Sequence, residues 1–503
     1  MTRRLRPGRL APARPAASLL LVSAVLAVGG AVAVATAPER TTGSAVERGP
    51  ARQVSVARAA ASCPDPVVDA GTTSRVALAG PGPVRPTGPD TRRPGQATLS
   101  TAGGSVLARL QAPGSAAVDA PAGSGPLVAR ATAGSAPGLA AAQLTRSTEA
   151  TMRGLSGTAC APAGTDFWFV GSGAVIGQRG RVYLTNPEPA PAVVDITLYG
   201  PDGPIDAPDG RGVSVAGGAQ EIRLLDALAP DTTRFAVHVR ARQGRVSAAV
   251  RDHQVEGLTP LGADWVPGAR APSGRVLVPG VPGGEGERLL QVVAPGGSDA
   301  IVRIRLLADS GAFAPAGLDL LEVRAGAVAE VDLAPHAGGE TVTVEVVSDV
   351  PVTAGVLARV RAAPPLLGEI AYAAATAPLT ADTPGVVPEV RQVAGRTNQL
   401  LLTAPGREVT AEVTPLPPAA GDPTVVTVPA GSQVALDLST VSGETEFAVT
   451  VAPRSGRLLA VHQVDEAESR GAFVTSSPVP PGRYRVPVPR VVADLSTGLR
   501  GGG

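Results

Sequence analysis

The sequence predicts an all-β protein: tandem immunoglobulin-like antiparallel β-sandwich modules that follow one N-terminal transmembrane helix. Three observations lead to this fold class. The chain has 503 residues with 61 glycines and 50 prolines, too long for one hydrophobic core and too rich in helix-breaking residues for long helices. Short stretches alternate apolar and polar residues, as strands with one buried face do. A strand-like motif that ends in proline also recurs along the chain.

The composition predicts aliphatic cores and argues against nucleic acid as a partner. Apolar residues make up 44% of the chain but aromatic residues only 2%, so the aromatic surfaces on which sugars and unstacked bases pack are scarce. All 44 basic side chains are arginine, and 43 acidic residues leave a formal net charge of +1. No overall basic field is therefore available to attract a polyanion.

The N-terminus predicts export and membrane attachment. Residues 16–37 carry no charge, and the preceding tail, residues 1–15, contains five arginines. Such a segment is long enough to span a bilayer, and the arginines are expected to stay in the cytoplasm. We predict a single-pass signal anchor in the cell membrane with the C-terminal region outside. Secretion after signal cleavage is the alternative, with Ala31-Val32-Ala33 as a usable cleavage site.

The exported part is expected to begin with a flexible stalk, residues 38–62, which is polar, rich in alanine and without periodicity. Cys63 and Cys160 follow on the side of the membrane where thiols are oxidised. We predict that they form a disulfide that closes an irregular first β module, residues 63–160. Two unrelated free thiols are the alternative.

A repeat divides the exported region into four modules. An apolar strand runs into proline at Pro187, Pro295 and Pro405, which are 108 and 110 residues apart. A weaker copy ends at Pro81, 106 residues before Pro187. Repetition at a fixed period is typical of tandem structural units. The predicted β modules are therefore 63–160, 161–265, 266–372 and 373–494, and residues 495–503 are predicted to be a flexible tail.

Three of these modules carry a further signal that predicts a hairpin. Alternating stretches flank Ala-Gly in the segments that begin at Val213, Leu321 and Val426. A small turn between two alternating runs is typical of a β-hairpin with one buried face. No helical pattern separates the strands, so antiparallel rather than parallel sheets are expected.

The connectors between modules contain rare large aromatic residues beside acidic ones. We interpret these residues as packing between modules or as a binding surface, with ordinary core packing as the alternative. They are Asp166, Trp168, Asp264, Trp265 and Tyr372.

The sequence offers no catalytic or metal-binding motif. None of the four histidines has a second ligand at zinc spacing, and the chain has no GxSxG turn. We therefore predict no metal, no cofactor and no enzymatic activity. Two carboxylates could still meet in space and cleave a glycan, and Asp166 and Asp264 would be the candidates. Their alternative role is to cap turns.

The order of several short motifs resembles a family of exported proteins of high-GC Gram-positive bacteria, the domain of unknown function family 5719. The resemblance covers about residues 63–492 and implies an exported, membrane-anchored protein; it implies no activity and no site residues. The motifs are the Arg-flanked apolar N-terminus, Cys63, Cys160 followed by Trp168-Phe169-Val170-Gly171, Leu184-Thr185-Asn186-Pro187, Gly200-Pro201-Asp202-Gly203 and Gly262-Ala263-Asp264-Trp265-Val266-Pro267.

Repeats without chemistry favour a non-catalytic scaffold or interaction protein of the cell envelope. Its expected partner is another exported protein or wall glycan. The alternative is a protein that binds envelope polysaccharide, or a glycan-active enzyme with carboxylates at a module junction.

Overall fold

The computed structural model describes residues 52–66, 71–83, 93–111, 113–149, 151–363, 365–419 and 421–488. The chain divides into two compact units. One comprises residues 1–53 and 487–503, of which only 52, 53, 487 and 488 are described. The other unit, residues 54–486, contains nearly all the described strands. The short strands β1 (Arg52–Ser55) and β35 (Arg485–Val488) span the limits of the two units.

The described chain is all-β, which confirms the predicted fold class at that level. Its sheets are antiparallel, and within 54–486 they form four sheet pairs, each with a hydrophobic core of its own. The helices of the described residues have three or four residues each and lie in connections between strands. They are η2 (Ala133–Ser135), η3 (Pro208–Gly210), α2 (Leu225–Leu228), α3 (Ala334–Ala337) and η4 (Leu438–Thr440).

The strands of each pair are counted here in chain order, with the two short strands that pair with one strand in the second and third pairs counted as one, and the long strand shared by both sheets of the third pair counted as two. In this count one sheet of each pair, here the central sheet, has the same strand order in all four pairs: fifth, second, seventh and last strand. The central sheets consist, in that order, of β6 (Gly114–Asp119), β3 (Thr72–Gly80), β8 (Ala140–Ser147) and β9 (Gly154–Ala159); of β15 (Gln220–Leu224), β11 (Arg181–Thr185), β17 (Ser247–Glu256) and β18 (Thr259–Val266); of β24 (Val328–Asp332), β20 (Gly286–Val293), β25 (Val342–Val360) and β26 (Glu369–Ala374); and of β31 (Ser432–Asp437), β28 (Arg396–Ala404), β33 (Leu459–Glu466) and β34 (Phe473–Pro478).

The second sheet of each pair, here the peripheral sheet, also repeats its order: first, sixth, third and fourth strand. In the third pair β25 continues from the peripheral into the central sheet. The peripheral sheets consist of β2 (Arg58–Cys63), β7 (Leu127–Thr132), β4 (Ala97–Thr101) and β5 (Val106–Leu110); of β10 (Asp166–Val170), β16 (Ala236–Gln243), β12 (Ala192–Gly200), β13 (Gly203–Ile205) and β14 (Val213–Val215); of β19 (Ser273–Val281), β25, β21 (Ala300–Ala308), β22 (Gly311–Phe313) and β23 (Leu321–Val323); and of β27 (Gly385–Arg391), β32 (Glu446–Pro453), β29 (Val409–Leu416) and β30 (Thr424–Val428).

The recurring prolines mark equivalent strands. Pro81, Pro187, Pro295 and Pro405 each follow the second strand of a pair, β3, β11, β20 and β28, within two residues of its end. A proline cannot donate to the ladder of a central strand. The motif therefore ends the same strand in each pair.

The predicted hairpins around Ala-Gly are wrong. β14 pairs with β12 whereas β15 pairs with β11, so these two strands lie in opposite sheets of the second pair. The equivalent strands of the third and fourth pairs separate in the same way. Alternation indicates one buried face for each strand, and two strands that face the same core from opposite sides satisfy it as well as a hairpin does.

The predicted stalk is wrong for residues 52–55, which form β1, and for residues 58–62, which belong to β2 and pair with β7. The predicted tail 1–15, the segment 16–37 and residues 38–51 of the stalk lie outside the described residues, as does the tail 495–503. No helix among the described residues is long and apolar enough to cross a membrane. The module boundaries stay a prediction, because contacts between the sheet pairs make 54–486 one compact unit.

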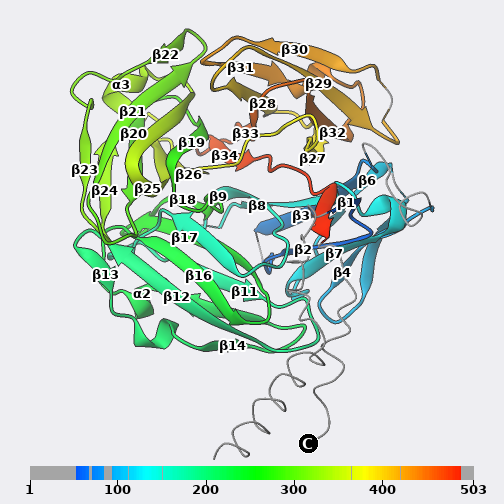
Figure 1. Cartoon of the computed structure of the whole chain (residues 1–503), viewed down its shortest axis with the longest axis horizontal. Coiled ribbons are helices and arrows are strands. Elements are labelled where there is room, and N and C mark those ends of the chain that lie inside the picture. Colours follow the sequence, from blue (N-terminus) through cyan, green and yellow to red (C-terminus); the bar gives the residue numbers. More distant parts are fainter. Residues whose placement is uncertain are drawn as a thin grey trace, which may run out of the picture. The chain divides into compact units, whose positions relative to one another are not determined.

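The last strands of the four pairs, β9, β18, β26 and β34, contact one another (Figure 1). β18 contacts β9 and β26, and β34 contacts the same two strands. The first and fourth pairs also meet directly, because β27 contacts β3 and β8. Each pair thus contacts the next, and the fourth contacts the first.

A disulfide joins Cys63 and Cys160, as predicted, with 4.4 Å between the two Cα atoms. Cys63 ends the edge strand β2 of the peripheral sheet, and Cys160 follows the edge strand β9 of the central sheet. Ser62 and Ala161 exchange two backbone hydrogen bonds beside it, of 2.8 and 3.0 Å. The bond therefore ties together the two sheets of the first pair.

Replacing both cysteines by serine should lower the stability of the first sheet pair by roughly 2–4 kcal/mol, because a 97-residue loop is then free in the unfolded chain. Thermal unfolding of the Cys63→Ser/Cys160→Ser variant is the measurement. Reductant should lower the melting temperature of the wild type and leave that of the variant unchanged. Equal melting temperatures of both proteins without reductant would contradict the prediction.

Candidate functional site

The structure separates the five predicted residues into two groups. Asp264, Trp265 and Tyr372 belong to β18 and β26, where the last strands meet. Asp166 and Trp168 lie on β10 instead, at the first strand of the second pair. The two groups therefore do not form one site.

The β10 group is a stack of rings beside the third sheet pair. The Trp168 ring lies parallel to His238 at 4.0 Å and is 5.7 Å from Tyr199. Asp166 pairs with His238 at 3.1 Å. Trp168 is only 6% exposed, and its carbonyl accepts a 2.7 Å hydrogen bond from the Ala269 amide. The indole is thus largely covered, and little of its face is left for a ligand.

Asp264 is the point at which all four last strands meet. Its carboxylate accepts four hydrogen bonds, and each of the four strands supplies one donor. The donors are the Gly157 amide of β9 at 3.2 Å, the Trp265 amide of β18 at 2.8 Å, the Tyr372 amide of β26 at 3.1 Å and the Thr475 hydroxyl of β34 at 3.1 Å. The side chain is 1% exposed, so these donors replace the water that a charged group requires.

A second buried acid, Glu369, lies beside it. Its carboxylate accepts amide hydrogen bonds from Leu155, Ala263 and Ile370 on β9, β18 and β26. The Arg153 guanidinium is 4.0 Å away and fully buried, and it donates to the Gly471 carbonyl of the fourth pair at 2.6 Å. Burial raises the pKa of both Asp264 and Glu369 well above the usual range, and their hydrogen bonds offset only part of this shift.

Tyr372 extends this network into the second pair. Its hydroxyl donates a 2.6 Å hydrogen bond to Asp252, a fully buried carboxylate that also accepts from Ser172, Gln178 and Gln254. Burial, together with the charge of Asp252, raises the pKa of Tyr372 well above its usual value. The buried acids thus hold sheet pairs together, and their lone pairs are occupied by protein donors.

Glycine makes the close approach of the strands possible. A Cβ atom at Gly154 would lie 2.6 Å from the Ala263 amide nitrogen, and one at Gly157 would lie 2.6 Å from the Ser477 hydroxyl. Side chains at these positions of β9 would force β18 and β34 away.

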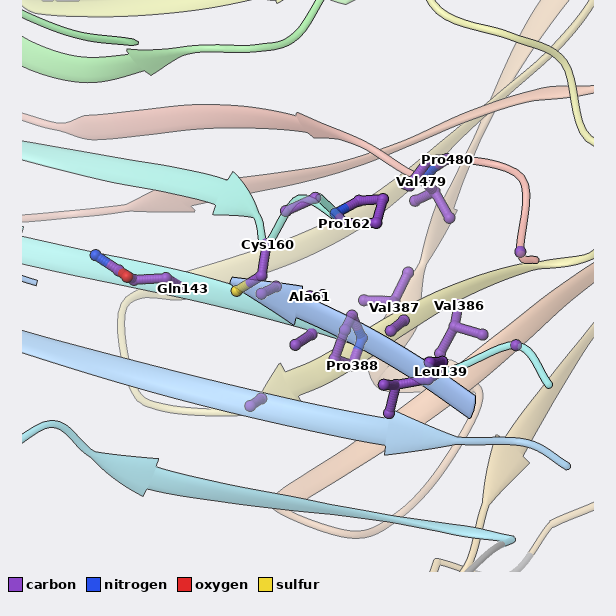
Figure 2. A pocket seen from close by; sticks show the side chains of 18 of the residues that line it. Ala61, Leu139, Gln143, Cys160, Pro162, Val386, Val387, Pro388, Val479 and Pro480 are labelled. Atoms are coloured by element: carbon purple, nitrogen blue, oxygen red, sulfur yellow. The ribbon is translucent and has the colours of Figure 1, made fainter. Parts of the chain in front are cut away.

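The described residues enclose a cleft of about 780 Å³ between the first and fourth sheet pairs, within the range of ligand pockets. Figure 2 shows its walls. Small apolar side chains and prolines form most of the lining, and Figure 2 labels Ala61, Leu139, Cys160, Pro162, Val386, Val387, Pro388, Val479 and Pro480 among them. No tryptophan, tyrosine or phenylalanine is among the described lining residues.

Ion pairs and apolar contacts hold the two walls in place. Arg75 on β3 pairs with Glu389 on β27, and with Glu446 at 2.6 Å. Arg146 of the first pair and Arg396 of the fourth both reach Glu466, at 2.5 and 2.6 Å. An apolar cluster of Ala79, Val386, Leu416 and Ala448 lies between the same two sheet pairs. The cleft is therefore a fixed feature of the contact between these pairs.

Besides its charged residues, the cleft has neutral polar side chains, among them His462 and Gln143. His462 is half-buried, and its Nε2 lies 3.2 Å from the Asn398 Oδ1. Burial, with the nearby charge of Arg396, lowers the pKa of His462 to about 4, so the ring is neutral at pH 7. Gln143 is 1% exposed, and its Oε1 has no hydrogen-bond partner among the described residues.

Residues 112–425 match the model of a protein family described as a family of unknown function, DUF5719. The chain belongs to this family. The matched residues run from the first sheet pair into the fourth and include Asp264 and Glu369. A comparison with curated proteins found no match.

Sequence reasoning selected Asp264 because it lies next to a rare aromatic residue, and Tyr372 because it is itself one. It missed Asp252, Glu369 and Arg153, because single charges on alternating strands look like ordinary solvent-facing positions. The cleft had no signal in the sequence, since alanine, valine and proline line it and are abundant throughout the chain.

Asp264→Asn should destabilise the chain most at low pH. A folded-state pKa above the unfolded value means that the folded chain binds the proton more tightly, so this acid's contribution to the free energy of unfolding falls as pH rises above about 4. Asparagine does not titrate, so its contribution to the free energy of unfolding does not fall as the pH rises. The loss of stability relative to wild type is therefore expected to shrink between pH 4 and pH 8 in urea unfolding.

The matched control is Asp202→Asn, at a side chain that is 96% exposed, which should change little at any pH. A stability difference of Asp264→Asn that stayed constant from pH 4 to pH 8 would contradict the assignment of a raised pKa.

The contribution of His462 to stability should change with pH in the opposite direction to that of Asp264. Its folded pKa of about 4 lies below the usual value of 6.5, so only the unfolded chain gains a proton as the pH falls between these values, and stability is lost. His462→Gln should flatten the pH dependence of the melting temperature over this interval. His336→Gln, in α3 and outside the cleft, is the control, and equal flattening by both variants would refute the prediction.

Proposed function

We propose that this chain is a non-catalytic interaction protein of the cell envelope, tethered by residues 16–37, that binds an exported partner in the cleft between its first and fourth sheet pairs. The observation that carries the proposal is the cleft itself. It has the volume of a ligand site. Small apolar side chains form most of its walls, and ion pairs hold the walls in place. A shaped cleft with a mostly apolar lining and a smaller number of polar groups is typical of a binding site.

The sheet pairs are proposed to be immunoglobulin-like modules. In the strand count given above, the second strand of every pair pairs with the fifth and the third with the sixth, which are also the central pairings of an immunoglobulin sandwich. The remaining strands sit at different edges from those of an antibody domain. The proposal therefore rests on the shared central pairings.

The buried acids argue against the glycan-active alternative. A catalytic carboxylate must reach the glycosidic oxygen or the anomeric carbon. Asp264 is 1% exposed and accepts four hydrogen bonds from the protein, so no sugar can approach it. The aliphatic lining of the cleft similarly lacks a ring on which a sugar could stack.

Crosslinking in intact cells, followed by affinity recovery of the chain, tests the proposal. Ala60→Trp fills the cleft at an exposed position of β2, whereas Ala227→Trp makes the same change at an exposed position of α2 outside the cleft. We expect Ala60→Trp to lose an exported protein that the wild type and Ala227→Trp both retain. Recovery of the same proteins with all three chains would overturn the proposal.

A further inference from the structure

The cleft contains an unpaired strand edge. β2 is the outer strand of its sheet, and the described strand beside it in that sheet is β7. On its free side the Val56 amide donates to the Tyr484 carbonyl at 3.0 Å, and Ser62 is paired with Ala161. Groups of alternate residues point to the same side of a strand, so Arg58 and Ala60 also direct their amides and carbonyls outward.

These groups have no backbone partner among the described residues. Arg58 and Ala60 are both exposed and both line the cleft. The two ends of the edge are thus occupied by the chain itself, while its middle is open within the cleft. Such an edge is a template onto which an extended peptide can add as a further strand.

The walls suit the side chains of an added strand. A peptide paired with β2 would place alternate side chains on opposite faces. Val387 and Pro388 of the fourth pair and Ala142 of the first line the cleft and offer apolar surface to one set.

The charged residues of the cleft indicate whether the peptide is acidic or basic. The described lining contains six arginines and two glutamates, although the whole chain has a formal net charge of only +1. Four of these arginines form no ion pair with any described carboxylate: Arg58, Arg130, Arg391 and Arg483. A concentration of unpaired positive charge favours an acidic ligand.

We infer that the cleft binds an extended acidic segment of a partner protein, which adds as a strand to the free edge of β2. This inference rests on the proposed function and names the partner's chemistry. An anionic amphiphile would use the same apolar walls and arginines, but it has no use for the open amides and carbonyls of β2. The strand edge therefore favours the peptide.

The test is selection from a displayed library of random peptides of about ten residues on the purified full chain. Enriched peptides should contain more aspartate and glutamate than the input library. Ala60→Pro removes the outward amide, which the β2–β7 ladder does not use, whereas Ala60→Thr keeps it in a similar volume. The dissociation constant of the leading peptide should be about tenfold higher for Ala60→Pro than for Ala60→Thr, since the two variants differ in the outward amide.

Arg58→Gln/Arg391→Gln should weaken the same peptide by about tenfold at low salt, because it removes two unpaired charges. Arg303→Gln, an exposed arginine on β21 outside the cleft, is the control and should leave binding unchanged. Melting temperatures of all variants show whether each chain is folded.

No enrichment, or equal binding by Ala60→Pro and Ala60→Thr, would overturn strand addition. Saturable binding of a fluorescent fatty acid by a chain that enriches no peptide would assign the cleft to an amphiphile instead. The crosslinking experiment separates the two proposals. If Ala60→Trp loses the partner and Ala60→Pro keeps it, the proposed function stands and strand addition fails; if Ala60→Trp also keeps the partner, the proposed function fails.

Discussion

The arrangement of the four sheet pairs depends on one buried carboxylate. Asp264 loses its water when β18 is enclosed, and a buried charge without donors is very unfavourable. Its four hydrogen bonds come from β9, β18, β26 and β34, one from each sheet pair. The carboxylate is satisfied only when all four strands are in place, so the burial of one charge favours a single relative arrangement of the pairs. Glu369 and Asp252 reinforce this arrangement with further donors from neighbouring pairs.

Features that depend on local sequence could be predicted, and features that depend on association of the pairs could not. Alternation, glycine and proline content and the recurring proline were enough for the all-β class, because each reports on a single strand or turn. The disulfide followed from two cysteines in an exported chain. The Ala-Gly segments were misread as hairpins, because alternation shows that a strand has a buried face but not which sheet it joins. The junction acids and the cleft arise from residues more than a hundred positions apart, and no local pattern marks them.

Two kinds of contact between sheet pairs therefore have different roles in this molecule. Where the last strands meet, glycines bring backbones together, and the buried acids accept hydrogen bonds from backbone and side-chain donors. Where the first and fourth pairs meet, Arg75 and Arg146 form ion pairs across the contact, and alanine and proline leave a cleft open beside them. The contrast arises from side-chain size and charge. At the junction of the last strands the polar groups bind one another, whereas the apolar cleft and its arginines without an ion-pair partner among the described residues are available to bind another molecule.

The contact of the fourth pair with the first has a consequence for how the chain unfolds. In an open solenoid the terminal repeats have one bare face, need polar capping units and fray before the middle does. Here every sheet pair has two neighbours, and the amide of Val56 near the start of the unit bonds to the carbonyl of Tyr484 near its end. Within the described part of 54–486, no sheet pair is a terminal repeat from which disorder could spread. The four sheet pairs therefore form one cooperative body, and the two ends of its chain, near Val56 and Tyr484, lie side by side. This is the condition under which a circular permutant keeps the contacts of the parent chain.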